Sequence, residues 1–303
     1  MSAFSRILQS ATCELFTAMR SRRAIAIIVL FCAASLLSVN AAISMLAGIE
    51  RELASSLGLQ PTDGAGIIST ALWKSTAFQR MVRTGIDNAL VFDDLLGRHP
   101  AELIHAWFSF LLTPMLVVLA CSNRVADDLH SGAVRFMITR VTRLEWSLGK
   151  FFGQALLILI GLLLGALGAD VVMSIRLSGS DALTILPTLL IWSCKAWVYS
   201  LAWLGVTLGV SHLTHSGAKA TMFAVLALLV FSVVPHILDH YSRTPDGGLG
   251  LLAHFRVLFP NTFEDNLWRN AFVPVMTGSI WLIAQGFLYL LVGHVVFARR
   301  DAR

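Results

Sequence analysis

Charged residues are scarce in this chain of 303 residues, since Asp, Glu, Lys and Arg together make up only 14% of it. Soluble domains usually carry about a quarter. Hydrophobic residues reach 56%, and the mean hydropathy is +0.73. So little charge excludes an ordinary soluble domain of this length. The net charge of +5 is informative only when it is assigned to individual loops, and it gives no reason to expect a nucleic-acid partner.

The sequence also lacks the Gly-x-x-x-x-Gly-Lys-[Ser/Thr] loop that holds nucleotide phosphates. The nearest match, Gly149-Lys150, has neither the earlier glycine nor the hydroxyl residue after the lysine. No soluble stretch of about 200 residues with alternating strands and helices is present to carry such a loop. We therefore expect this chain to bind no cofactor and to have no enzymatic activity of its own.

Six long runs contain no charged residue, apart from Lys195 in the fourth. They cover residues 24–49, 103–123, 151–169, 182–210, 220–238 and 271–298. Each is close to or above the roughly 20 residues that cross a hydrocarbon layer of ~30 Å. Only a helix satisfies its own backbone groups there. The sequence predicts an all-α integral membrane protein with spans at about residues 24–49, 103–123, 148–175, 182–210, 218–238 and 271–298.

The loops between these spans alternate in charge. The N-terminal segment, the second and fourth loops and the C-terminal tail hold thirteen cations and five acids, a net charge of +8. The remaining loops have a net charge of −4, with Lys195 left inside the membrane. Because basic loops are retained on the cytoplasmic side, the +8 side should face the cytoplasm. Both termini are then cytoplasmic.

Residues 1–23 have an amphipathic pattern. Apolar residues recur at helical spacing, namely Phe4, Ile7, Leu8, Ala11, Leu15, Phe16 and Met19. A basic amphipathic helix directly before a span is typical of the headgroup region, although packing on a soluble partner is an alternative. We therefore divide the chain into a cytoplasmic amphipathic helix, residues 1–23, and a six-span domain, residues 24–303.

Two outer segments have their own patterns. Residues 66–88 have the spacing of an amphipathic helix on the outer surface, and Pro100 suits the first turn of the second span. Residues 239–270 are too apolar for a solvated loop and too interrupted by Gly and Pro for a span. For this segment we expect re-entrant or interfacial short helices whose polar breaks are buried in protein.

The segment between the second and third spans carries the most specific pattern. Asp128 precedes Gly132 by four residues, an apolar stretch follows, and then come Val141-Thr142-Arg143 and Gly149-Lys150. This layout resembles that of the permease subunits of ABC-2-type (type V) ABC transporters. The sequence departs from the family pattern in having Asp128 for the usual Glu, Ala133 for Thr and Arg140 for Pro.

The resemblance implies an exporter permease in a bacterial inner membrane, with a second copy or a related permease completing the substrate path. A separate ATPase subunit would bind ATP and Mg, and the segment between spans two and three would be its coupling helix. A helix–glycine–helix segment with Phe136, Met137 and Ile138 between charges also suits docking into a groove of such a partner. The candidate coupling residues are Asp127, Asp128, Gly132, Arg135, Phe136 and Arg143. Membrane lipids are further partners, and the sequence does not identify the cargo.

Lys195 and Asp170 form the second candidate site. A cation near the middle of a span costs at least about 2.5 kcal/mol unless it faces protein or water. Asp170, at the outer end of the third span, is the best candidate partner in the sequence. The pair is either structural or part of a polar cavity that selects substrate. An ion-coupled transporter built on these two residues is an alternative function.

His236, Asp239 and His240 form a third candidate site at the outer end of the fifth span. Two histidines four residues apart lie on one helical face and can bind a divalent metal. His254 is a possible third ligand. A membrane metalloenzyme is therefore another alternative, but interfacial histidines without a metal are the favoured interpretation, because such histidines are common and no Glu stands beside either one.

The predicted topology can be tested by cysteine labelling. In a variant without Cys13, Cys32, Cys121 and Cys194, single cysteines are placed at either end of the chain or in the outer segments. We expect an impermeant maleimide added to intact cells to label residues 50–102 and 239–270, and to leave Ser2 and Arg303 unlabelled. A labelled terminus in intact cells would contradict the topology.

Overall fold

A computed structural model describes residues 2–56, 76, 79, 89–95, 98, 100–137, 139–177, 182–242 and 252–299. These residues are almost entirely helical, and no strand element lies among them. The all-α fold predicted from the sequence is confirmed. The helix expected over residues 66–88 lies outside the described residues, apart from positions 76 and 79.

Six helices are long and apolar enough to cross a membrane. Their spans are Arg22–Ile49 in α2 (Arg22–Ser56), Ala101–Ser131 in α6 and α7 (Pro100–Cys121, Arg124–Ser131), Arg143–Arg176 in α9 (Arg143–Arg176), Ile185–Ser211 in α10 (Ala182–Ser211), Gly217–His240 in α11 (Gly217–Ser242) and Phe272–Arg299 in α13 (Phe272–Arg299). All six overlap the predicted spans, and α6 begins at Pro100 as expected.

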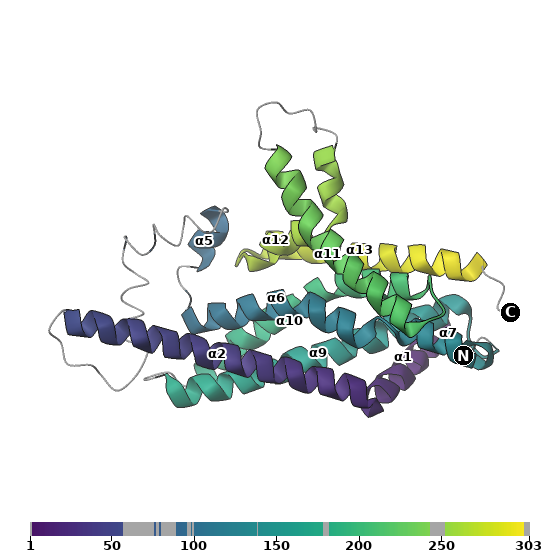
Figure 1. Ribbon diagram of the computed structural model, residues 1–303, viewed down its shortest axis with the longest axis horizontal. Helices are drawn as coiled ribbons and strands as arrows, with labels where there is room; N and C mark the ends of the chain where they lie inside the picture. Colours follow the sequence, from purple (N-terminus) through teal and green to yellow (C-terminus); the bar gives the residue numbers. More distant parts are fainter. Residues whose placement is uncertain are drawn as a thin grey trace.

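Helix α10 is the centre of the bundle. Figure 1 shows α2, α6, α9 and α10 lying side by side along the long axis, and α10 packs against α6, α9 and α13. The buried share of the span is 67% in α10 but only 11% in α11. Helix α11 inclines away from the other spans (Figure 1). We call the end that carries α1, α7 and the turn at residues 212–216 the basic end.

Glycines allow α10 and α13 to touch through their backbones. A Cβ at Gly205 would lie 2.0 Å from the carbonyl oxygen of Gly286, and one at Gly293 would lie 2.4 Å from that of Gly209. Small residues permit this approach, which gains van der Waals contact between spans. Gly161, Gly165 and Gly168 of the third span instead face side chains of α2.

The segment before α13 enters the bundle as three short helices: η1 (Leu252–Leu258), η2 (Pro260–Phe263) and α12 (Glu264–Trp268). Two of its polar contacts are made with the spans. Gln285 Nε2 donates to the carbonyl of Val257 at 2.6 Å, and Tyr199 Oη donates to Asn261 Oδ1 at 2.8 Å. Leu267 is fully buried. This is the re-entrant arrangement expected from the sequence.

Helix α1 (Ala3–Arg20) packs on α9 through a face whose buried residues share only Ala11 with the predicted apolar stripe. Its buried residues are Ser10, Ala11, Glu14 and Ala18. They pack on α9, where a Cβ at Gly149 or Gly153 would collide with α1. Phe4 and Phe16 are 74% and 63% exposed. The large apolar residues therefore face outward, as an interfacial helix requires, and the small ones make the contact with α9.

The contact between α10 and α13 gives a stability prediction. Gly205→Ala must separate the two backbones, and overpacking of this kind usually costs about 1–3 kcal/mol. Gly161→Ala is the matched control, because its Cβ would meet nothing closer than 3.7 Å. We expect a lower apparent melting temperature in detergent for Gly205→Ala, and no loss for Gly161→Ala. Equal melting of the two variants would contradict the close contact.

Candidate functional site

The segment between the second and third spans continues α6 and then breaks. Helix α7 ends at Gly132, whose φ of 73° lies in the left-handed region. Glycine adopts this conformation without the steric cost of a Cβ. Helix α8 (Ala133–Met137) and a turn at residues 139–142 then lead into α9. The helix break predicted at Gly132 is therefore confirmed.

A capping box fixes the residue at which α9 begins. Thr142 Oγ1 accepts a hydrogen bond from the backbone N–H of Glu145 at 3.2 Å, and Glu145 Oε2 accepts one from the N–H of Thr142 at 2.9 Å. This pairing satisfies two donors that a helix start leaves open. Glu145 Oε1 also accepts from Arg6 Nη2 of α1 at 2.6 Å. One carboxylate thus starts α9 and holds α1.

Lys150 connects three helices at the basic end. Its Nζ lies 2.5 Å from Glu14 Oε2 of α1 and 2.7 Å from Asp128 Oδ2 of α7. Gln154 Nε2 donates to the second oxygen of Glu14 at 2.5 Å. The side chains of Lys150 and Glu14 are 9% and 6% exposed, whereas Asp128 is 31% exposed. A buried cation with two carboxylate partners joins α1, α7 and α9.

The other predicted coupling residues take two kinds of position. Asp127 accepts from Asn123 Nδ2 at 2.5 Å, and Arg143 Nη1 donates to the carbonyl of Ala298 in α13 at 2.8 Å. These contacts lie within the chain. Arg135 is exposed, and the ring of Phe136 is 80% exposed. Asp127 is exposed as well, but it is bonded to Asn123. Arg135 and Phe136 are the exposed pair just beyond Gly132, and we call them the α8 tip.

A buried hydrogen-bond chain joins α9, α10 and α13 behind this segment. Ser147 Oγ lies 3.0 Å from both His212 Nε2 and His294 Nδ1. His212 Nδ1 lies 2.7 Å from the carbonyl of Leu208, so it donates and Nε2 accepts. Ser147 then donates to His212, and His294 donates to Ser147. Burial lowers the pKa of His212 to about 4, which keeps this imidazole neutral.

The structure places Lys195 differently from the sequence prediction. Its Nζ donates to the carbonyl of Arg269 at 2.9 Å and lies 4.3 Å from the ring centroid of Trp192. Within the described part of the chain, Lys195 and Asp170 form no ion pair, so that predicted pairing is wrong. Backbone carbonyls are good acceptors for a cation inside a bundle, and the carbonyl of Arg269 lies closer in the fold than Asp170.

The turn that accepts from Lys195 is also held from the outer loop. Arg269 Nε donates to Asp94 Oδ2 at 2.5 Å, and Asn270 Nδ2 donates to the Asp94 carbonyl at 2.6 Å. Asp94 lies in α5 (Ala89–Leu95). The hydrogen bond from Arg269 keeps the pKa of the Asp94 carboxyl below its usual range. Lys195 and Asp94 together fix the end of the re-entrant segment.

The proposed metal ligands do not form a cluster in the described residues. Asp239 is paired with Arg256, whose Nη1 lies 2.5 Å from Asp239 Oδ1. Among the described positions, no three His, Cys, Asp or Glu side chains are placed to hold one ion. His236, Asp239 and His240 are all described, and they form no such group. The metal site considered from the sequence spacing is therefore not supported.

Sequence reasoning missed Glu14, Lys150, Ser147, His212 and His294 as site residues. Two signals were present in the sequence. Glu14 follows Ala11 by three residues and precedes Ala18 by four, so an acid stands on a helix face of small residues. The Thr142-x-x-Glu145 spacing is that of a capping box. No local pattern marks the two histidines, because they meet Ser147 only in the folded bundle.

The Lys150 cluster predicts unequal effects for its two carboxylates. Glu14→Gln leaves a buried ammonium with one partner fewer, and removing one side of a buried pair typically costs about 3–5 kcal/mol. Asp128→Asn should cost less, because Asp128 is 31% exposed. Glu52→Gln, at an exposed position of α2, is the control. Thermal unfolding of the purified chain measures all three, and equal stability of Glu14→Gln and Glu52→Gln would refute the assignment.

Comparison with known proteins agrees with this architecture. Residues 8–245, which are more than half of the chain, match the family described as ABC-2 family transporter protein. No curated protein matches the chain. The match includes α7, α8 and most of the spans. This chain is a multi-pass membrane permease of an ABC transporter and belongs to the ABC-2 family.

Proposed function

We propose that this chain is the transmembrane subunit of an ATP-driven exporter and that a separate ATPase subunit binds the α8 tip. Permeases of the ABC-2 family generally pair with an ATPase subunit. The observation that carries the proposal is the aromatic ring of Phe136, 80% exposed beside exposed Arg135 and just beyond the break at Gly132. Aromatic residues and arginine dominate the energetics of protein interfaces.

The contacts of the site supply a route from the tip to the spans. Only Gly132 separates α8 from α7, and Asp128 of α7 pairs with Lys150 at the start of the third span. Arg143 connects the same segment to the end of α13. A displacement of α8 by the ATPase therefore acts on α7, α9 and α13. In this proposal Asp127, Asp128, Gly132 and Arg143 transmit the motion, and Arg135 and Phe136 receive it.

The orientation follows from charge. The segments with a net charge of +8 in the sequence are those whose described residues lie at the basic end, so we place this end, with both termini, in the cytoplasm of a bacterial inner membrane. The α8 tip lies at this end, where a soluble ATPase is accessible. The ATPase would bind ATP and Mg, and the permease itself would need no cofactor and catalyse no reaction.

A second copy, or a related permease, would complete the substrate path. The support for this part is the family assignment together with the low burial of two spans, 22% in α2 and 11% in α11. Lipids and a partner permease are the apolar surfaces that can cover such helices in a membrane. The cargo is not specified by these observations.

The α8 tip can be tested by co-purification with the candidate ATPase. Phe136→Ala removes an exposed ring and leaves no internal cavity, so the permease itself should remain stable. We expect the complex to weaken by about 2 kcal/mol or more if Phe136 anchors the interface. Substrate-stimulated ATP hydrolysis should fall in parallel.

Phe4→Ala is the matched control, because Phe4 is 74% exposed on a different helix of the same end. It should leave both the yield of complex and ATP hydrolysis unchanged. If Phe136→Ala and Arg135→Ala both retain the wild-type complex and wild-type hydrolysis, the α8 tip is not the docking element.

A further inference from the structure

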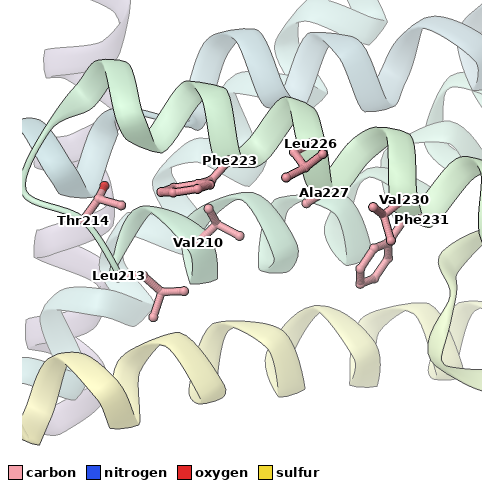
Figure 2. Close-up of a pocket in the computed structure, with 8 residues that line it drawn as sticks. All are labelled: Val210, Leu213, Thr214, Phe223, Leu226, Ala227, Val230 and Phe231. Atoms are coloured by element: carbon pink, nitrogen blue, oxygen red, sulfur yellow. The ribbon is translucent and has the colours of Figure 1, made fainter.

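An apolar groove runs along α11 on the side that faces α10 and α13. Eight residues line it, and we call it the α11 groove: Val210, Leu213, Thr214, Phe223, Leu226, Ala227, Val230 and Phe231. Its volume is about 390 Å³, within the range of pockets that hold small molecules. Figure 2 shows the side chains of α11 directed toward those from the end of α10, with α13 running along the other side. Thr214 supplies the hydroxyl among otherwise apolar residues.

The two ends of the groove differ. At the end away from the basic loops, the ring of Phe231 lies 5.2 Å from that of Phe259 and 5.5 Å from that of Tyr289. The Tyr289 hydroxyl donates to the carbonyl of Leu258, which ties this aromatic group to the re-entrant segment. At the other end the groove reaches the turn at residues 212–216, where Leu213 is 40% exposed. The groove therefore has an aromatic group at one end and an exposed turn at the other.

The mouth of the groove is basic. Lys219 precedes Phe223 by four residues, and Leu226 and Val230 follow at intervals of three and four, so Lys219 extends the same helical face beyond the groove. Its side chain is exposed. Asp127 approaches α11 at Gly217, which lies two residues earlier and therefore on nearly the opposite face. Lys219 thus projects beside the groove and away from that acid.

The end of α13 adds positive charge close by. The ring of His212 lies 5.6 Å from that of Phe297, so the 212–216 turn adjoins the last turns of α13. Arg143 is bound there to the Ala298 carbonyl, and Arg299 is exposed. An occupant whose head lies at this mouth therefore meets a predominantly basic surface.

We propose that the α11 groove holds one acyl chain of an anionic phospholipid from the leaflet at the basic end, with its phosphate beside Lys219. Hydrocarbon chains gain little by exchanging lipid neighbours for leucine-like side chains. The selectivity must then come from the headgroup. Each basic residue near an anionic lipid surface contributes enough for a preference of about fivefold.

Photolabelling of the full-length chain in nanodiscs tests the site without any ATPase, so it is independent of the coupling proposal. The probe is phosphatidylglycerol with a diazirine midway along one acyl chain, and the same phosphatidylcholine derivative is the neutral comparison. We expect phosphatidylglycerol adducts in residues 210–214 and 223–231. Ala227→Trp fills the groove and should abolish them, whereas Val225→Trp, on the outward face of α11, should not. Lys219→Gln should lower phosphatidylglycerol labelling about fivefold and leave phosphatidylcholine labelling unchanged.

Other outcomes would overturn the proposal. Equal labelling by the two lipids, or labelling that survives Ala227→Trp, would show ordinary contact with the bilayer. Loss of the adduct on ATP hydrolysis in the presence of the ATPase would identify the occupant as cargo. A disulfide between two Leu226→Cys chains that excludes the photoprobe would show that a second copy fills the groove.

Discussion

A cation removed from water must keep partners, and Lys150 meets this requirement with two carboxylates from separate parts of the chain. Glu14 brings α1 onto α9, and Asp128 brings α7 onto the same residue. Gly149 and Gly153 leave the room that this contact needs. The geometry of the basic end, including the direction in which the α8 tip protrudes, therefore depends on one ammonium group. Asp128 is the more exposed of the two partners, so it is the contact that a docking protein can most readily shift.

The packing of α13 on the bundle depends on close backbone contact. Glycines on α10 and α13 bring the two helices together, and the re-entrant segment fills the space beside them. Trp268 packs at 5.1 Å from Trp192 and 5.0 Å from Phe110, while Lys195 holds the turn that follows. The intramembrane lysine is thus satisfied by a backbone carbonyl. Its position is explained by the need to end a broken helix inside apolar surroundings.

The sequence predicted the six spans, the break at Gly132 and the re-entrant segment because each depends on local composition: apolar length, a glycine after a helix, and Gly and Pro within an apolar stretch. It failed at contacts that the fold alone creates. The sequence suggested Asp170 as the partner of Lys195 because an acid is the usual partner of a lysine. Every residue has a backbone carbonyl, so the sequence could not indicate that the carbonyl of Arg269 would be the acceptor. The apolar stripe of residues 1–23 predicted the helix but not the whole face that packs on α9, because Ser10 and Ala18 are too small to stand out in a hydrophobic pattern. Ser147 and His294 from two spans meet His212 from the turn after α10, and the three residues share no local motif.

The attachment of α1 has a consequence for the order of events during synthesis. Arg6 and Glu14 find their partners, Glu145 and Lys150, 139 and 136 residues later in the chain. At ~5–20 residues per second, α1 waits roughly 7–30 s before α9 exists. During that interval the charged side chains of α1 have no buried partner. Its exposed rings, Phe4 and Phe16, allow the helix to lie in the bilayer interface. The bilayer interface thus acts as a holding site for the first helix until the third span arrives to receive it.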